Sequence, residues 1–126
     1  MKPKLKQFAV ENRGNYFSVE NTGLTETDYA KIISVFERFA ALEKVVLYGS
    51  RAKGNYSQYS DIDIVLAGNG LDLKIKQHIE LALDDLYLPY YFDVSILSKI
   101  DNADLVAHIN RVGIEIYKNS TFPQKS

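Results

Sequence analysis

The sequence contains no cysteine, no long apolar run and almost no excess of either charge. Without cysteine the chain cannot form disulfides, thiolate metal sites or a cysteine nucleophile, and it fits a reducing compartment. No segment approaches the roughly eighteen apolar residues of a membrane span, and the basic residues 1–6 lead into no apolar run. We therefore expect no signal peptide, no membrane anchor and a cytoplasmic location.

The charge balance and length limit the function and the number of domains. The chain has 15 basic and 16 acidic residues in 126, so we expect no surface that grips nucleic acid directly. Repeats, low-complexity segments and long linkers are also missing, which favours one domain. We expect an N-terminal extension over residues 1–24, a domain over 25–118 and a disordered tail over 119–126. The extension suits a short hairpin, because Asn12-Arg13-Gly14-Asn15 interrupts its apolar residues.

Helical and strand patterns alternate along the chain. Thr25 and Asp28 resemble a capping box, and the apolar residues that follow recur at helical spacing to about Leu42. A second amphipathic helix follows Gly70, and Pro89 is expected to halt it. Asp101 or Asn102 can cap a third. Short apolar runs predict strands at 45–48, 62–66 and 91–97, with an edge strand at 114–117. This alternation predicts a small α/β fold, a sheet with helices packed on it.

The most informative motif is Gly49-Ser50-Arg51-Ala52-Lys53-Gly54, followed by Asp61-Ile62-Asp63 with ten residues between Ser50 and Asp61. Asp61 and Asp63 should project from the same face of a strand, because side chains two apart point the same way. Two adjacent carboxylates repel unless a cation joins them. Magnesium, with one or two carboxylates, waters and substrate phosphates as ligands, resolves the conflict. A nucleoside triphosphate is the natural second half of such a site.

The residues around these carboxylates complete a candidate site. Gly49 lets a phosphate approach the backbone, and Ser50 offers a hydroxyl and an amide where a short helix can begin. Arg51 and Lys53 either neutralise further phosphate charge or lie in solvent. Asp93, flanked by apolar residues on the third strand, is the expected third carboxylate. It could hold a second metal ion and accept a proton from an attacking hydroxyl.

These motifs carry a family resemblance. The glycine-serine motif, Ser60-Asp61-Ile62-Asp63-Ile64 and Asp93-Val94 resemble the minimal nucleotidyltransferases (MNT) of the DNA polymerase beta superfamily, over about residues 25 to 117. The resemblance implies a nucleotidyltransferase fold with a small mixed sheet. It also implies that Gly49 and Ser50 bind the triphosphate of ATP, while Asp61, Asp63 and Asp93 hold two magnesium ions.

The same resemblance implies a partner. Family members of this size are commonly encoded beside a HEPN-domain toxin, a ribonuclease, and act as its antitoxin. Some transfer AMP from ATP to a tyrosine of the toxin. We therefore expect a hetero-oligomer with a HEPN protein from an adjacent gene, in which the chain is the transferase.

Other interpretations of the residues stay open. Asp61 and Asp63 on their own could be the solvated edge of a strand. His78 and His108 lack partners at metal-ligand spacing and are read as structural. Five tyrosines could stack on adenine, contact a partner, accept a nucleotide or simply pack: Tyr56, Tyr59, Tyr87, Tyr90 and Tyr91.

Two other functions are compatible with the sequence. The chain could neutralise its partner by binding alone, in which case neutralisation survives the change of Asp61 and Asp63 to alanine. It could also modify a small molecule such as an aminoglycoside. The absence of a second domain to build an acceptor pocket argues against that enzyme, unless another subunit supplies one.

Overall fold

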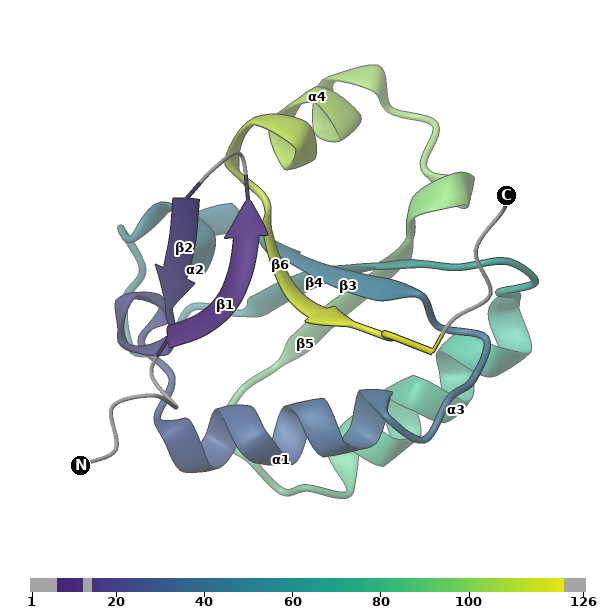
Figure 1. Ribbon diagram of the computed structural model, residues 1–126, viewed down its shortest axis with the longest axis horizontal. Coiled ribbons are helices and arrows are strands. Elements are labelled where there is room, and N and C mark those ends of the chain that lie inside the picture. Colours follow the sequence, from purple (N-terminus) through teal and green to yellow (C-terminus); the bar gives the residue numbers. More distant parts are fainter. Residues whose placement is uncertain (1–6, 13–14, 122–126) are drawn as a thin grey trace.

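The computed structural model describes residues 7–12 and 15–121, with side chains from Ser18 onward. Its centre is a four-stranded sheet in the order β5-β4-β3-β6 (Figure 1). Strand β3 is antiparallel to β4 and β6, whereas β4 and β5 are parallel. The strands are β3 (Lys44–Tyr48), β4 (Ile62–Ala67), β5 (Phe92–Ile96) and β6 (Ile114–Lys118). The sheet is mixed, which confirms the predicted fold class, and β6 is an edge strand as expected.

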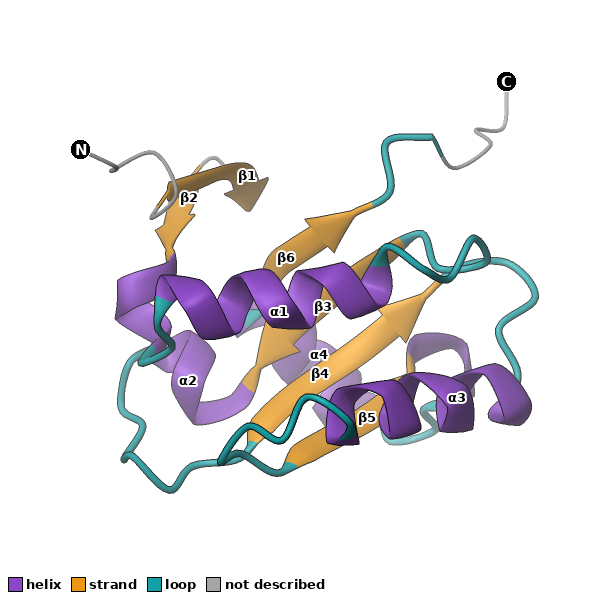
Figure 2. Cartoon of the chain, turned by 90° about the horizontal axis from the view of Figure 1, so that it is seen from below, coloured by secondary structure: helices purple, strands orange, loops and turns teal. Residues whose placement is uncertain are grey.

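Helices cover both faces of this sheet. Figure 2 shows α1 (Glu26–Phe36) and α3 (Leu73–Asp84) in front of the sheet and α4 (Ala103–Val112) behind it. The short α2 (Gly49–Lys53) follows β3 directly, and a 3-10 turn, η3 (Leu97–Lys99), follows β5. In the described part of the chain, no helix has the length and apolar character that a membrane crossing requires.

Side-chain caps define where the longer helices begin. The Thr25 hydroxyl accepts a hydrogen bond from the Asp28 amide at 3.0 Å, which confirms the predicted N-cap of α1. Asp72 caps α3 in the same way. Of the two candidates for α4, Asn102 is the cap, since its Oδ1 accepts from the Leu105 amide at 3.1 Å.

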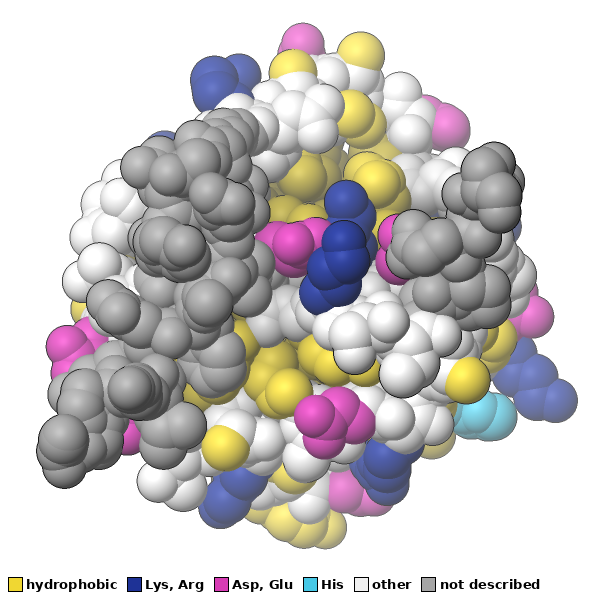
Figure 3. Space-filling model, viewed as in Figure 1, with side chains coloured by type: hydrophobic (Ala, Val, Ile, Leu, Met, Phe, Trp, Pro, Cys, Tyr) yellow, Lys and Arg dark blue, Asp and Glu magenta, His cyan; other side chains and the backbone are white. Residues whose placement is uncertain are grey.

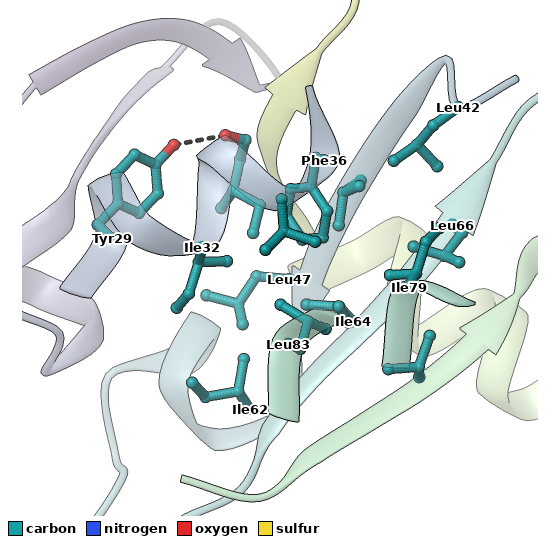
Figure 4. Packing of buried hydrophobic residues seen from close by; sticks show 14 of the residues in the cluster. Tyr29, Ile32, Phe36, Leu42, Leu47, Ile62, Ile64, Leu66, Ile79 and Leu83 are labelled. Carbon is teal, nitrogen blue, oxygen red and sulfur yellow. Dashed lines mark hydrogen bonds between the residues drawn. The ribbon is translucent and has the colours of Figure 1, made fainter. Parts of the chain in front are cut away.

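The main core lies between the sheet and the α1/α3 layer (Figure 4). Ile62 and Ile64 of β4 are buried there, as the alternation predicted, beside Phe36 of α1 and Ile79 of α3. The Tyr29 hydroxyl donates a hydrogen bond to the backbone oxygen of Ile116, which fastens α1 to β6. Burial of this many apolar side chains provides most of the drive to fold.

A smaller cluster on the opposite face lies under α4. It contains Tyr48 of β3, Val65 of β4 and Ile109 of α4. Since Val65 points toward α4, alternation along β4 directs Asp63 to that same face. The sheet therefore divides an apolar core on one side from the carboxylate side chain on the other.

Two predicted helix boundaries are wrong. Helix α1 ends at Phe36, not near Leu42, because the chain tightens into turns in which the Arg38 and Phe39 amides bond to Val35 and Phe36. These turns bring Leu42 into the core. Helix α3 ends at Asp84, well before Pro89, where the chain enters a turn that places Tyr87 at a φ of 55°.

The folded unit extends beyond residues 25–118. Strands β1 (Gln7–Asn12) and β2 (Asn15–Ser18) form the expected antiparallel hairpin, whose turn residues 13–14 lie outside the described part. The following 3-10 helix η2 (Val19–Thr22) places Val19 in the main core. At the other end, the Asn119 amide bonds to the Glu43 carbonyl at 2.8 Å. Ordered contacts therefore reach into the expected tail, of which residues 122–126 are not described.

On the face shown in Figure 3, basic and acidic side chains are scattered among apolar ones. Lys44 of β3 and Glu115 of β6 lie 4.0 Å apart across neighbouring strands. The described residues on that face form no broad field of positive charge.

Candidate active site

Three neighbouring strands bring the predicted carboxylates together. Asp63, the second residue of β4, lies opposite Asp93 of the parallel strand β5 and opposite Tyr48 of the antiparallel strand β3. Residues that pair across a sheet point to the same face. Asp61 directly precedes β4, and its charge, like that of Asp93, acts on the carboxyl of Asp63.

The carboxyl group of Asp63 lies in an environment that disfavours its charge. Partial burial, together with the negative charges of Asp93 and Asp61, raises its pKa from 3.8 to about 6. Asp61 and Asp93 themselves are exposed. A nearby cation would therefore stabilise the charged form of Asp63, while the carboxylates of Asp61 and Asp93 remain open to a ligand.

Gly49 shapes the space around Asp63. It has a φ of 76°, a conformation that side chains rarely adopt, and a Cβ on it would fall well under 3.0 Å from Oδ2 of Asp63. The carboxylate therefore packs directly on the turn from β3 into α2, where Ser50 follows. The structure brings Gly49 against Asp63, with Ser50 next in the chain; their binding of a nucleotide stays a prediction.

A magnesium ion fits the oxygen donors of this site only with help from a substrate. Among the residues that the structure describes, no three acidic, histidine or cysteine side chains are arranged to hold a metal ion by themselves. Magnesium commonly uses one or two carboxylates and completes its shell with phosphates and waters. The Asp61 and Asp63 pair, which carries uncompensated negative charge at Asp63, suits an ion that arrives with a triphosphate.

Arg51 does not lie in solvent, so that alternative is wrong for this residue. Its side chain is 1% exposed, the largest among the fully buried side chains of the described residues. NH1 donates to the Thr22 carbonyl at 2.9 Å, while NH2 and Nε donate to the Ser60 carbonyl at 3.0 and 3.2 Å. Because every guanidinium nitrogen binds a backbone carbonyl, the arrangement favours a structural role over the predicted contact with phosphate.

Two tyrosines complete the surroundings of Arg51. The guanidinium carbon lies 5.3 Å from the ring centre of Tyr56 and 5.1 Å from that of Tyr90. The Tyr90 hydroxyl in turn donates to Asp28 at 3.0 Å. Arg51 therefore joins the helix that carries Ser50 to the segments that precede Asp61 and β5.

The other candidate residues take different positions. Lys53 is exposed at the end of α2, so its predicted contact with phosphate stays a prediction. His78 is exposed on α3, and the His108 ring meets the edge of the Tyr48 ring at 6.2 Å between centres. Three of the five tyrosines are exposed: Tyr59, Tyr87 and Tyr91.

Sequence reasoning missed Tyr48 and Ser95. Burial raises the pKa of the Tyr48 hydroxyl, a hydrogen bond with Ser95 lowers it, and the charges of Asp93 and Asp63 raise it further. Both residues could have been found from spacing: Tyr48 ends the strand before Gly49, and Ser95 lies two residues beyond Asp93 on the same face. Tyr48 and Ser95 therefore share a face of the sheet with Asp63 and Asp93.

The environment of Asp63 predicts how stability depends on pH. The carboxyl of Asp63 binds its proton more tightly in the native protein than in the unfolded chain, where its pKa is the ordinary 3.8. Its contribution to the free energy of unfolding is therefore complete below pH 3.8 and is lost as the pH rises through about 6. Since the group is partly exposed, we expect a loss of about 1 kcal/mol. Urea unfolding of metal-free protein at pH 5 and pH 7.5 measures it. The same loss in Asp63→Asn would contradict the assignment.

Replacing Arg51 with lysine tests its structural role. A lysine keeps the charge but cannot bond the Thr22 and Ser60 carbonyls with a planar set of donors, so we expect the free energy of unfolding to fall by about 2 kcal/mol. Lys53→Gln, an exposed change on the same helix, should shift it by less than about 0.5 kcal/mol. Equal unfolding midpoints in urea for the two variants would argue against the role.

Comparison with known proteins agrees with this geometry. The family model described as polymerase beta, nucleotidyltransferase matches residues 30–122. No curated protein matches the sequence. A chain from the crystal structure of a toxin-antitoxin with AMP-PNP is similar in structure, with a TM-score of 0.61 and 21% identity over 73% of this chain and 74% of that chain.

Two further solved structures share the fold. One is a chain from the structure of the complex between the tri-AMPylated Shewanella oneidensis HEPN toxin and an MNT antitoxin. Its TM-score is 0.57, with 18% identity over 76% of this chain and 74% of that chain. The other is a candidate nucleotidyltransferase from Sulfolobus solfataricus, with a TM-score of 0.51 and 17% identity over 86% of this chain and 93% of that chain. At these identities the likeness shows a common fold.

Proposed function

Because the chain belongs to the polymerase beta nucleotidyltransferase family, we propose that it transfers AMP from ATP to a hydroxyl group of a HEPN-domain toxin, and that it acts as the antitoxin. The transfer requires magnesium, and the expected acceptor is a tyrosine. The observation that carries the proposal is the pairing of Asp63 with Asp93 on one face of the sheet, directly against the Gly49 turn.

Both the neighbours and the exposure of the site support a protein acceptor. The similar structures include a toxin-antitoxin with AMP-PNP and an AMPylated HEPN toxin bound to its antitoxin. In the present chain Asp61 and Asp93 are exposed at the sheet, so a side chain of another protein can reach them. The chain supplies the catalytic half of the site, and the toxin supplies the acceptor.

The proposed reaction is a displacement at phosphorus. The acceptor oxygen attacks the α-phosphorus of ATP, the bond from that phosphorus to the oxygen bridging to the β-phosphate breaks, and pyrophosphate leaves. Asp93 accepts the proton of the acceptor hydroxyl. Gly49 lets the triphosphate approach the backbone, Ser50 donates hydrogen bonds to it, and Lys53 adds positive charge.

The carboxylates would hold the magnesium. Asp61 and Asp63 would bind one ion, and Asp93 would join them in holding a second. The ions, when bound, offset the charge that builds on the phosphates and acidify the acceptor hydroxyl. The charged form of Asp63 would also be stabilised, because a cation offsets the burial and the repulsion that raise its pKa. The attached AMP would then inhibit the toxin, because a bulky anion near its RNA-binding surface repels phosphate.

The experiment combines the protein with magnesium, labelled ATP and the HEPN protein encoded by the adjacent gene, and follows each chain by intact-mass analysis. We expect the HEPN protein to gain one or more AMP units, and the gain to disappear when Asp61 and Asp63 are changed to alanine. If no AMP is transferred while the double variant still neutralises the toxin, neutralisation occurs by binding and the catalytic proposal fails. Transfer to an aminoglycoside alone would reject the protein acceptor.

A further inference from the structure

Exposed large apolar side chains are concentrated in one stretch of the chain. Five large apolar side chains are strongly exposed among the described residues, and four of them belong to α3 or to the connection from α3 to β5. They are Leu73, Leu81, Tyr87 and Tyr91. Single exposed apolar residues are ordinary, but those that line a common groove indicate a surface that binds another molecule.

Two of the four, Leu81 and Tyr91, line an open groove of about 410 Å³ between α3 and the start of β5. Leu81, 61% exposed, and Tyr91, 70% exposed, contribute its apolar walls. The complete lining is Gln77, Glu80, Leu81, Asp84, Tyr91 and Phe92. We call these six residues the α3–β5 groove. Figure 2 shows α3 and β5 next to each other on the side of the sheet away from β6.

The groove borders β5, the strand that carries Asp93. Phe92 is the first residue of β5, and Asp93, the proposed proton acceptor, follows it. β5 is an edge strand of the sheet, so an acceptor can reach Asp93 from this side without crossing another strand. Phe92 packs on the α1/α3 side of the sheet, whereas Asp93 shares the α4 side with Asp63, so a molecule held in the groove reaches Asp93 by passing round the edge of β5.

The charges in the groove specify what it can hold. Its charged lining consists of two carboxylates, Glu80 and Asp84, and no basic side chain lines it among the described residues. Lys76 pairs with Glu80 at 2.8 Å from the preceding helical turn, whereas Asp84 is exposed at the end of α3. An acidic rim around an apolar floor complements an apolar side chain with a basic neighbour.

We propose that the α3–β5 groove binds a segment of the acceptor protein, one that presents an apolar side chain next to a lysine or arginine. The inference rests on the proposed function, because it identifies the acceptor as a protein that must be held beside Asp93. Tyr91 and Leu81 anchor the segment, and Asp84 pairs with its cation. The groove thus fixes the acceptor on the enzyme while the adjacent strand performs the transfer.

The test measures binding separately from transfer. Isothermal titration calorimetry compares the full chain and its variants for binding to the HEPN protein of the adjacent gene, and for binding to ATP. We expect Leu81→Glu and Tyr91→Ser each to weaken the protein complex at least tenfold, and Asp84→Lys to weaken it severalfold. ATP binding should stay within twofold of the unchanged chain, which also shows that the variants are folded.

The same helix provides a matched control. Leu73 is 59% exposed, close to the 61% of Leu81, but it does not line the groove. Leu73→Glu should therefore leave the affinity for the HEPN protein within twofold. Equal losses in Leu73→Glu and Leu81→Glu would overturn the assignment of the groove, as would unchanged affinity in Leu81→Glu and Tyr91→Ser.

The remaining outcomes separate this proposal from the proposed function. If the variants lose binding but no chain ever transfers AMP, the docking surface stands and the enzymatic function falls. If AMP is transferred and the groove variants transfer it at the normal rate and affinity, the function stands and the groove proposal falls. If sedimentation shows a dimer of the chain that Leu81→Glu dissociates, a second copy occupies the groove and the proposal is wrong.

Discussion

Changing Asp63 to asparagine is expected to lower the rate of AMP transfer at saturating ATP by about a thousandfold or more. The amide keeps the size of the side chain but removes the charge at the centre of the carboxylate group, between Asp61 and Asp93. A steady-state assay with labelled ATP and the HEPN acceptor measures the effect.

Two features make the result interpretable. Because the charge of Asp63 is disfavoured in the metal-free protein, the asparagine variant should unfold at the same or a slightly higher urea concentration near neutral pH, so lost activity does not reflect lost folding. Asp101→Asn makes the same chemical change at an exposed position outside the site and should keep nearly full activity. More than a tenth of normal activity in Asp63→Asn would exclude Asp63 from the catalytic group.

Changing Gly49 to alanine should lower the free energy of unfolding by about 3 kcal/mol and reduce transfer at least a hundredfold. Two costs combine in this substitution: a left-handed backbone at a φ of 76° and a methyl group inside contact distance of Oδ2 of Asp63. The carboxylate must move away from the turn, which separates it from the position where the triphosphate binds. Urea unfolding and the transfer assay measure the two effects.

Gly54→Ala serves as a control, because it introduces the backbone strain of Gly49→Ala without the steric clash. It has a similar φ of 87°, but a Cβ there would meet nothing within 4 Å, so Gly54→Ala should cost about 1 kcal/mol and leave transfer within a few fold. In a double-mutant cycle, the cost of Gly49→Ala should fall to that of Gly54→Ala once Asp63 is also alanine. If Gly49→Ala remains equally costly there, contact with Asp63 is not its cause.

Local pattern predicted the parts of the site that depend on neighbouring residues. Asp61 and Asp63 needed only the two-residue repeat of a strand, and Gly49 needed only its place after an apolar run. The partnership with Asp93 followed from placing it on the next apolar strand, although the register that sets Asp63 against Asp93 belongs to the folded sheet.

Arg51 shows where local pattern ends. Its partner Thr22 is 29 positions away in sequence, and both acceptors are backbone carbonyls that carry no signal in the side-chain sequence. An arginine beside a glycine-serine motif therefore reads equally as a phosphate ligand or a surface residue. The end of α1 was also beyond local pattern. Helical spacing continues to Leu42, but the chain turns after Phe36, and these turns carry Leu42 into the core.

The pairing of β6 with β3 has a consequence for the order of folding. β6 is the last strand of the sheet in chain order, yet it pairs with β3, where Lys118 lies opposite Lys44. Its Ile116 carbonyl also accepts the hydrogen bond from the Tyr29 hydroxyl. Such distant pairings form late, because closing a long loop costs entropy before contacts repay it. We expect β3 and β4, which are close in sequence and position Asp63, to pair before β6 joins them. The edge of β3 would then stay open to wrong partners until β6 closes it.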